Sequence, residues 1–465
     1  MSNNDELDKV DFPQKVYTSV RGSETLYYSP DRGVSVVVNQ DGKDILEACR
    51  MGKTITEVAY KLSAGRDSIV SIIHDIIQPF IFEMKRCRFL KDSQQQNIND
   101  IHSDLPSLPI KLTTLYLHIT DTCNLKCVYC YNKKKRLENE IADKDSSNHL
   151  SFQQINQLID ETAKLKAKEI VFTGGEPLCN KDMYKLAAYA KEKGLKTTLL
   201  TNGTLIDQYM ADTIAKSFDS VVVSFDSCIK KEYEILRPGA PFESAVNGIQ
   251  NLVAAKVSSV VIRSVITSFN LESLSELPRF AAKFLGCLKF LSASYIPNHP
   301  EDIETLKLLP NPEDYWRTLN RFHSEIKKLG GEVVSESIPL EASGSCGAGG
   351  SVLSIAPNGD VYPCQCLHSD EFCAGNFKKQ SLIEIIDKSQ VLSLFRKQQW
   401  PWFDSCSECA LMSICSSTCR VFPKVFKEDE KVFFEYMCPF FKKEIENKLW
   451  IEAGKQQKPI KSKVC

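Results

Sequence analysis

Six strand-like segments alternate with helical segments between residues 112 and 296, and this alternation constrains the fold more than any other feature of the chain. The expected strands are 114–120, 169–175, 196–203, 220–227, 260–267 and 288–296. Such alternation predicts an α/β fold with a parallel sheet, either open or rolled into a partial barrel. Chemistry in these sheets collects at the carboxyl ends of the strands, so motifs that follow different strands can face one mouth.

Composition narrows the class of protein. A chain of 465 residues is too long to fold around one compact hydrophobic core, and its length suggests three structural units. Hydrophobic residues make up 43%, charged residues 25%, and the formal net charge is −1, which gives nucleic-acid binding no electrostatic support. No apolar run approaches the ~20 residues of a membrane span. The polar start MSNNDELDKV is not a signal peptide, so we expect a cytoplasmic protein with no nucleic-acid or membrane partner.

Eighteen cysteines are unusual for such a chain and favour metal binding or catalysis over disulfides. Twelve fall in two groups: Cys123, Cys127 and Cys130, then Cys346, Cys364, Cys366, Cys373, Cys406, Cys409, Cys415, Cys419 and Cys438. The other six are scattered, and we expect them to be small buried hydrophobes or idle thiols: Cys49, Cys87, Cys179, Cys228, Cys287 and Cys465.

Five segments are expected along the chain. Residues 1–92 form a small unit, in which TLYYSP and VSVVVN alternate like a strand hairpin before three amphipathic helices. A polar, proline-containing linker follows over 93–109. The strand–helix repeats occupy 110–335, and a cysteine-rich region with little periodicity occupies 336–450. Residues 451–465 are expected to be a tail.

The stretch DTCNLKCVYC places Cys123, Cys127 and Cys130 directly after the first strand of the repeats. Thiolates are soft ligands that suit zinc or iron–sulfur clusters. Three of them would leave one metal of a 4Fe–4S cube open to an external ligand. A zinc site completed by a remote ligand is the alternative.

The spacing of this triplet, with Tyr129 before its last cysteine, resembles the signature of the radical S-adenosylmethionine (SAM) superfamily. GGEP, after the second strand, is similar to that superfamily's second motif. The resemblance implies that the amino and carboxylate groups of SAM chelate the open iron. Gly174 and Gly175 would let the backbone approach the methionine moiety, and Glu176 would pair with or orient its ammonium.

The same resemblance implies further SAM contacts. Ser224 would contact the ribose with Asp226 supporting it, Thr201 and Asn202 would border the methionine moiety, and Tyr129 would lie near the adenine.

Two other positions bear on this site. Where the family's usual pattern has glycine, this chain has Ser227, which puts the local turn in doubt. For Arg263, a contact to the SAM carboxylate and a structural ion pair remain equally open. The implied chemistry is reductive cleavage of SAM to a 5′-deoxyadenosyl radical that abstracts a substrate hydrogen. No side chain is assigned as a catalytic acid or base.

The second cysteine group resembles the seven-cysteine SPASM domain, which holds two auxiliary 4Fe–4S clusters; zinc-ribbon pairing is the alternative. SIAPNGDVYPC is similar to that family's hairpin around Asn358–Gly359. By position, the outer cluster would be bound by Cys406, Cys409, Cys415 and Cys438, and the inner by Cys346, Cys364 and Cys419.

The family's eighth cysteine is absent, because Gly347–Pro357 contains none. The inner cluster then either keeps an open iron or recruits Cys366 or Cys373. An open iron would provide a place for a substrate thiolate.

The first 92 residues resemble a PqqD-like element that recognises precursor peptides, a winged-helix-like fold. VVVNQDGKDILEACRMGKTITEVAYKL carries the likeness. Such elements add a leader peptide as a strand to the hairpin edge. A generic helical cap and a DNA-binding winged helix are the alternatives.

Together these resemblances imply a partial (β/α)6 TIM-like barrel between a winged-helix-like domain and an iron–sulfur SPASM domain. They imply SAM, three 4Fe–4S clusters, a precursor peptide and an electron donor such as flavodoxin or ferredoxin. The expected activity is peptide maturation by a thioether cross-link, of the sactipeptide or ranthipeptide type. A carbon–carbon cross-link, a sulfatase-type maturase and a zinc-stabilised binding module are the alternatives.

Overall fold

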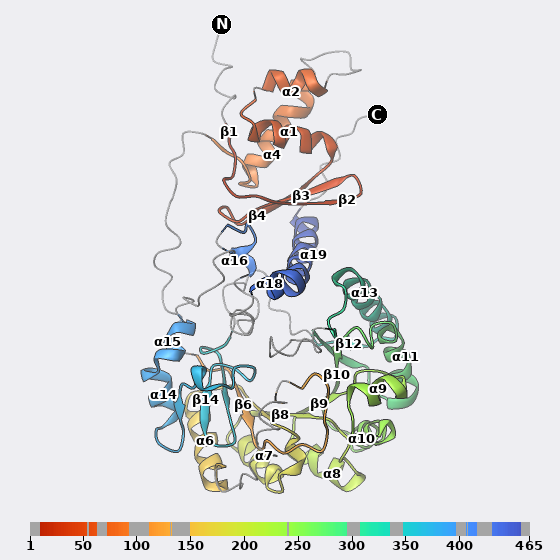
Figure 1. The fold of residues 1–465 in the computed structure, drawn as a ribbon, viewed down its shortest axis with the longest axis vertical. Coiled ribbons are helices and arrows are strands. Elements are labelled where there is room, and N and C mark those ends of the chain that lie inside the picture. The colour runs from red at the N-terminus through yellow and green to blue at the C-terminus, as the bar shows by residue number, and fades with distance from the viewer. Residues whose placement is uncertain are drawn as a thin grey trace.

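A curved sheet wrapped by helices and a smaller unit built on a three-stranded sheet make up the ribbon in Figure 1. The computed structural model describes residues 10–53, 55–62, 72–92, 111–130, 132, 149–239, 241–294, 307–334, 347–396, 406, 408–415 and 430–456. The expected linker 93–109 and the cysteines Cys346, Cys419 and Cys465 lie outside the described residues.

The six expected strands are confirmed and pair in chain order, each parallel to the next. They are β6 (Thr114–His118), β7 (Glu169–Thr173), β8 (Lys196–Thr201), β9 (Ser220–Ser224), β10 (Val260–Ile266) and β11 (Lys289–Ser294). The strands β6 to β10 end slightly before the boundaries that their patterns predict, because the chain leaves the sheet there to form loops at one edge. The prediction of an α/β fold with a mostly parallel sheet is therefore correct.

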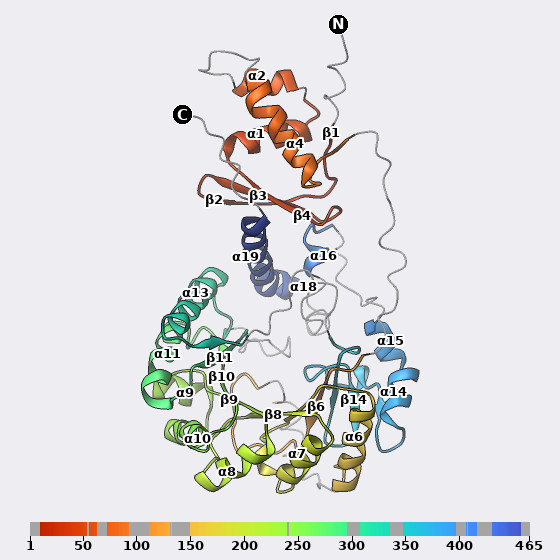
Figure 2. The ribbon, with the colours of Figure 1, turned by 180° about the vertical axis from the view of Figure 1, so that it is seen from behind.

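Helices cover the convex side of this sheet, as Figures 1 and 2 show from opposite directions. They include α6 (Phe152–Lys164), α7 (Met183–Glu192), α8 (Gln208–Ser217), α9 (Lys230–Leu236), α10 (Phe242–Ala254) and α13 (Pro312–Lys328). The start of α6 is fixed by a capping box, in which Ser151 and Gln154 exchange side-chain and backbone hydrogen bonds.

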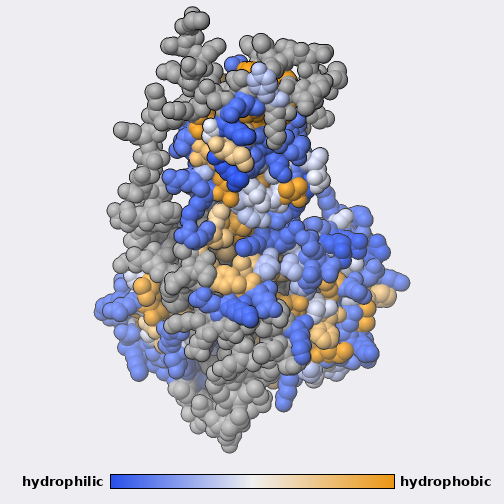
Figure 3. Space-filling model, turned by 45° about the horizontal axis from the view of Figure 1, so that its top comes forward, coloured by the Kyte–Doolittle hydropathy of each residue, from blue (hydrophilic) through white to orange (hydrophobic). Residues whose placement is uncertain are grey.

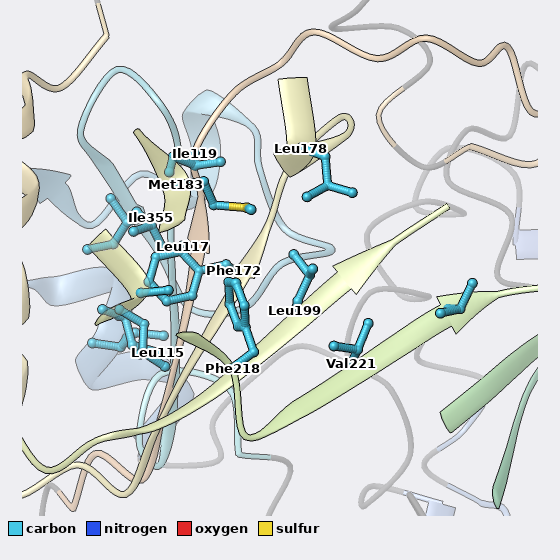
Figure 4. Close-up of a cluster of buried hydrophobic side chains, with 14 of the residues drawn as sticks. Leu115, Leu117, Ile119, Phe172, Leu178, Met183, Leu199, Phe218, Val221 and Ile355 are labelled. Atoms are coloured by element: carbon cyan, nitrogen blue, oxygen red, sulfur yellow. The ribbon is translucent and has the colours of Figure 1, made fainter. Parts of the chain in front are cut away.

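The core lies between the sheet and these helices, and Figure 4 shows part of it. Leu115, Leu117, Phe172 and Leu199 point into it and are fully buried. Phe172 meets Phe218 edge to face, with ring centroids 5.6 Å apart. Burying each such side chain stabilises the fold by ~1.5–3 kcal/mol. This core layer therefore fixes the positions of the strands whose carboxyl ends carry the loops of the candidate site.

The sheet extends beyond the six strands on both sides. β12 (Glu332–Val333) pairs in parallel with β11, and β13 (Val352–Ile355) pairs in parallel with β6. β14 (Asp360–Tyr362) and β15 (Gly375–Asn376) follow in antiparallel order, which confirms the expected Asn358–Gly359 hairpin. The second cysteine group is therefore partly built on the same sheet as the first.

The N-terminal unit contains an antiparallel sheet in the order β2-β3-β4, and its three helices lie on one side of this sheet, two of them packed directly on it. The elements are β2 (Tyr17–Arg21), β3 (Glu24–Ser29), β4 (Val34–Val38), α1 (Gln40–Arg50), α2 (Ile55–Leu62) and α4 (Gln78–Arg86). The expected hairpin is β3–β4, whereas β2 did not stand out in the sequence. A π-helical segment, Ile73–Ile77, precedes α4. The short strands β1 (Val10–Asp11) and β5 (Lys91–Asp92) pair across the ends of the unit.

The second face of the β2-β3-β4 sheet packs on the C-terminal helices α16 (Met412–Cys415) and α19 (Cys438–Gln456). Leu26 and Tyr28 of β3 meet Leu449 of α19 in one buried cluster. Trp450 Nε1 donates to Ser19 Oγ at 3.3 Å. Figures 1 and 2 show the sheet lying between its own helices and α19. α19 continues to Gln456, inside the segment expected to be a tail.

The described part of the surface is mixed in hydropathy. On the face seen in Figure 3, hydrophobic side chains lie along the middle and in further groups at the lower left and lower right, with hydrophilic side chains among them. Among the described residues, no helix has both the length and the apolar character required to cross a membrane.

Candidate active site

The first cysteine loop follows β6 and folds back against the segment after α9. Lys126 N donates to Pro238 O, and Val128 N donates to Leu236 O, both at 3.0 Å. These two backbone bonds fix the middle of the loop to a segment more than 100 positions away. The loop therefore has a defined shape before any ligand is considered.

The three thiols of this loop interact electrostatically with one another. Burial raises the pKa of Cys123 to about 12, and the charges of Glu176, Cys127 and Cys130 act in the same direction. All three cysteines are half-buried. This soft donor set fits a four-iron cluster with one iron left for an external ligand.

The two glycines after β7 are required by the cysteine loop itself. Gly175 N donates to Thr120 O at 2.8 Å. A Cβ at Gly174 (φ +139°) would lie 2.3 Å from Thr120 O, and one at Gly175 would lie 2.3 Å from Thr122 O. Close backbone packing within the chain thus demands glycine here. Their predicted approach to the methionine moiety of SAM remains a prediction.

Glu176 is buried and joins the loop after β7 to the loop after β8. Its Oε1 accepts from Leu178 N at 3.1 Å and Thr201 Oγ1 at 2.7 Å, and its Oε2 accepts from Asn202 N at 2.8 Å. Burial raises the pKa of Glu176 to about 7 although these hydrogen bonds oppose the rise. No salt bridge reaches Glu176 from the described residues. A buried carboxylate of this kind fits as the acceptor for the N–H groups of the SAM amino group.

Asn202 also connects this network to the cysteine loop. Its Nδ2 donates to Asn124 Oδ1 at 2.9 Å, and Asn124 Nδ2 donates to Thr204 Oγ1 at 2.9 Å. Glu176, Thr201 and Asn202 are therefore brought together, as expected for residues at one mouth. Asn124 was not predicted, because a single polar residue inside the cysteine motif has no pattern of its own.

A second network surrounds Asp226, which is fully buried. Its Oδ2 accepts from Arg237 Nε at 2.6 Å and from the hydroxyl of Tyr129, and its Oδ1 accepts from Val265 N at 2.9 Å. Arg237 Nη1 also lies 3.8 Å from Cys127 Sγ. The structure thus brings Tyr129 and Asp226 together with Cys127, a predicted cluster ligand, through Arg237, which sequence reasoning missed.

Ser227, which departs from the family's glycine, has a structural explanation. Its Oγ accepts from Ile229 N at 2.9 Å and donates to Glu232 Oε2 at 2.7 Å. It therefore caps the turn that leads into α9, and the serine closes the turn rather than disrupting it.

Ser224 and Arg263 lie side by side on β9 and β10, where they are register partners. Both are half-buried at the same edge of the sheet. This position at the edge of the sheet suits the predicted contact of Ser224 with the ribose. It is compatible with both predicted roles of Arg263, a contact to the SAM carboxylate and a structural ion pair.

The expected outer auxiliary set is described in full. Burial raises the pKa of Cys406 to about 11, and the charges of Cys438 and Cys409 raise it further. Cys409 and Cys415 pack against the same buried cluster, the one shared with β3 and α19. The four thiols come from the segment before α16, from α16 itself and from the first residue of α19.

The expected inner set is described only at Cys364, just after β14. Cys373 lies just before β15, and the β14–β15 register brings its segment alongside Pro363. The Cys373 thiol donates to Gly375 O at 3.5 Å. Cys366 and Cys373 therefore remain candidates for the fourth ligand. Among the described residues, no three Cys, His, Asp or Glu side chains are arranged to hold a single metal ion.

Both regions match models of known protein families. Residues 117–281 match the radical SAM superfamily, and residues 346–410 match the iron–sulfur cluster-binding domain named SPASM. The mycofactocin maturase MftC of Mycobacterium tuberculosis is 28% identical over 331 residues, which cover 67% of this chain and 78% of MftC.

Two solved structures share the fold. Streptococcus suis SuiB bound to the precursor peptide SuiA superposes with a TM-score of 0.56, covering 89% of this chain and 96% of SuiB at 14% identity. The protein anSMEcpe with bound AdoMet gives a TM-score of 0.55, covering 74% of this chain and all of that chain at 19% identity.

The cofactors of this chain are therefore SAM and three 4Fe–4S clusters, one that binds SAM and two auxiliary. The residues at the mouth fit them: three thiols would leave one iron open, and beside them lies the buried carboxylate of Glu176, to which no described residue forms a salt bridge. When bound, the cluster and SAM would supply the electron and the sulfonium needed for radical chemistry on a substrate.

Proposed function

We propose that this chain, in which a radical SAM domain precedes a SPASM iron–sulfur domain, matures a ribosomally made precursor peptide. The observation that carries the proposal is the N-terminal sheet. Within the described residues β2 and β4 are its outer strands, and neither is paired to a further strand. Open sheet edges bind extended peptides by main-chain hydrogen bonds. The relatives named as a maturase and as a complex with a precursor peptide support this proposal.

The N-terminal unit would hold the leader of the peptide, as a PqqD-like element does. Its three-stranded sheet and three helices are compatible with that winged-helix-like fold. Leader binding at this unit would place the core peptide within reach of the barrel mouth. Residues 1–92 would then serve for recognition, residues 110–335 for radical formation and residues 336–450 for the auxiliary clusters.

At the barrel mouth the chain's own residues would bind and orient the cofactor. Glu176, Thr201 and Asn202 would hold the methionine end of SAM, while Ser224 and the Tyr129–Asp226 pair would hold the nucleoside end. When bound, the cluster and SAM supply a hydrogen-abstracting radical. The surrounding protein would exclude water and hold the peptide hydrogen near the reacting carbon. A flavodoxin or ferredoxin would supply the electron.

We favour a thioether between a cysteine sulfur and a carbon as the product. For this product the carbon would give up one hydrogen atom, and the thiol would lose its proton as the S–C bond forms. One electron is then left over, and an auxiliary cluster would serve as its acceptor, so the peptide would lose two hydrogens in all. The absence of cysteine from residues 347–357 supports an open inner iron that would bind the substrate thiolate. A carbon–carbon cross-link has the same mass change and uses the auxiliary clusters only as electron acceptors.

Mass spectrometry of the precursor peptide after turnover tests the product. We expect the peptide to lose two hydrogens and one alkylatable thiol for each link. The control is a peptide in which each cysteine is replaced by serine, and it should remain unmodified. A product that has lost two hydrogens while every cysteine still alkylates would contradict the thioether and favour the carbon–carbon link.

Leader dependence separates peptide maturation from a sulfatase-type maturase, which would not need the N-terminal unit. Deleting residues 1–92 is a poor test, because their sheet also covers the apolar face of α19. The intact protein should instead be given a core peptide without its leader. We expect at least tenfold slower turnover than with the full precursor, partly restored by adding the leader as a separate peptide. Equal rates with and without leader would favour the sulfatase-type activity.

A further inference from the structure

The guanidinium of Arg237 lies between a cluster cysteine and the Asp226 network. Its Nε bonds to Asp226 Oδ2 at 2.6 Å, while its Nη1 lies 3.8 Å from Cys127 Sγ. Only 5% of the Arg237 side chain is exposed. Two different nitrogens of one planar group therefore contact the carboxylate and the sulfur at the same time.

The same guanidinium covers the ring of Tyr129, with its carbon 5.5 Å from the ring centroid. Tyr129 in turn donates its hydroxyl to Asp226. Arg237, Asp226 and Tyr129 thus each contact the other two. Tyr129 belongs to the cysteine loop, between Cys127 and Cys130, so these contacts join Arg237 and Asp226 to that loop.

Backbone hydrogen bonds on both sides of Arg237 support its contact with Cys127. The flanking residues Leu236 and Pro238 accept the two bonds that hold the cysteine loop, from Val128 N and Lys126 N. Arg237 therefore cannot shift without moving the loop that carries Cys127. One turn earlier on α9, the buried hydroxyl of Tyr233 has no hydrogen-bond partner among the described residues.

We propose that Arg237 is a positioning residue for the SAM-binding cluster and that its charge raises the reduction potential of that cluster. A reduced cluster carries one more negative charge than an oxidised one, and a buried cation beside a ligand sulfur favours the reduced state. The carboxylate of Asp226 neutralises part of the positive charge of Arg237. It accepts from Nε, however, whereas Nη1 of the same guanidinium faces Cys127 Sγ. This inference rests on the SAM cluster and is independent of the substrate.

An electron paramagnetic resonance titration of the fully loaded protein tests the proposal. The signal that changes when SAM is added identifies the relevant cluster among the three. In Arg237→Gln, we expect the ratio of reduced to oxidised cluster at a fixed potential to fall about tenfold, which is ~59 mV for one electron. Arg237→Lys keeps the charge and should change this ratio less than about threefold, on the same conversion.

A surface arginine of the same domain provides the control. Arg279 pairs with Glu325 and its side chain is 59% exposed, so Arg279→Gln should leave the potential unchanged. If Arg237→Gln fails to retain the cluster, loss of its four irons with both auxiliary signals intact supports the positioning role. An unchanged potential in a fully loaded Arg237→Gln protein overturns the proposal, and so does an equal shift in Arg237→Lys and Arg237→Gln.

Discussion

At the scale of single residues, Glu176 is the clearest titratable group of the site. Burial raises its pKa to about 7, so a large share of the carboxyls carry a proton near neutral pH. An N–H of the iron-bound amino group of SAM, donating a hydrogen bond to this carboxylate, would favour the ionised form and lower that pKa. SAM binding should then release a proton when the pH is below 7.

The predicted result is a SAM affinity that rises as the pH increases from 6 to 8, by up to about tenfold per pH unit below the free pKa. Glu176→Gln should bind SAM more weakly and show a smaller rise in affinity with pH, because only the SAM amino group then loses a proton on binding. Isothermal titration calorimetry in buffers of different ionisation enthalpy measures both affinity and proton release. Equal pH dependence and equal proton release in the unmodified protein and in Glu176→Gln would contradict a contact between Glu176 and the SAM amino group.

At the scale of elements, the loop after β6 and the loop after β7 depend on each other. In Gly175→Ala, the new Cβ would lie 2.3 Å from Thr122 O, and that neighbour is backbone that cannot rotate away. We expect a cost of about 1–3 kcal/mol and a displaced cysteine loop. Iron analysis after anaerobic reconstitution should show roughly four irons fewer than the twelve expected for three clusters.

Gly454→Ala is the matched control for this prediction. Gly454 lies in α19, and an added Cβ there meets nothing within 4 Å. Its iron content should equal that of the unmodified protein. A Gly175→Ala protein with full iron and unchanged SAM binding would show that the close approach of the two loops is dispensable.

The elements also show what sequence can predict and what it cannot. The six strands were predictable because each is a short apolar run bounded by turns, and their parallel order follows from the helices between them. The pairing of β13 with β6 was not predictable, because Val352 and Thr114 are distant in sequence and no local pattern links them. Ser227 and the cysteine spacing were visible in the sequence. Arg237 was not, because an arginine at the end of a helix is common and only the folded chain places it beside Cys127.

At the scale of the whole molecule, the N-terminal sheet and α19 form one packed unit. Leu449 is 1% exposed in the cluster shared with Leu26 and Tyr28. In Leu449→Asp, an unpaired charge would be buried there, at a cost on the order of 3 kcal/mol or more. We expect faster hydrogen exchange in β3 and α19. The outer cluster should also lose iron faster to a chelator, because Cys409 and Cys415 pack against the same apolar cluster.

Ile451→Asp tests the specificity of this effect. Ile451 lies on the same helix but is 58% exposed, so its replacement adds the same charge without burying it. The rates of hydrogen exchange in β3 and α19, and of iron loss to the chelator, should equal those of the unmodified protein. Equal behaviour of the two aspartate variants would mean that the sheet does not protect the outer cluster.

The contact between β2 and α19 also bears on the synthesis of the chain. Ser19 and Trp450, which are hydrogen-bonded, are 431 positions apart. A ribosome that adds ~5–20 residues per second makes the second about 20–90 s after the first. Until α19 is made, Leu26 and Tyr28 have no partner helix, whereas Cys123, Cys127 and Cys130 are made about a quarter of the way through this interval. The cysteines proposed to bind the SAM cluster are therefore synthesised, and open to iron–sulfur assembly factors, well before the contact between β2 and α19 can form.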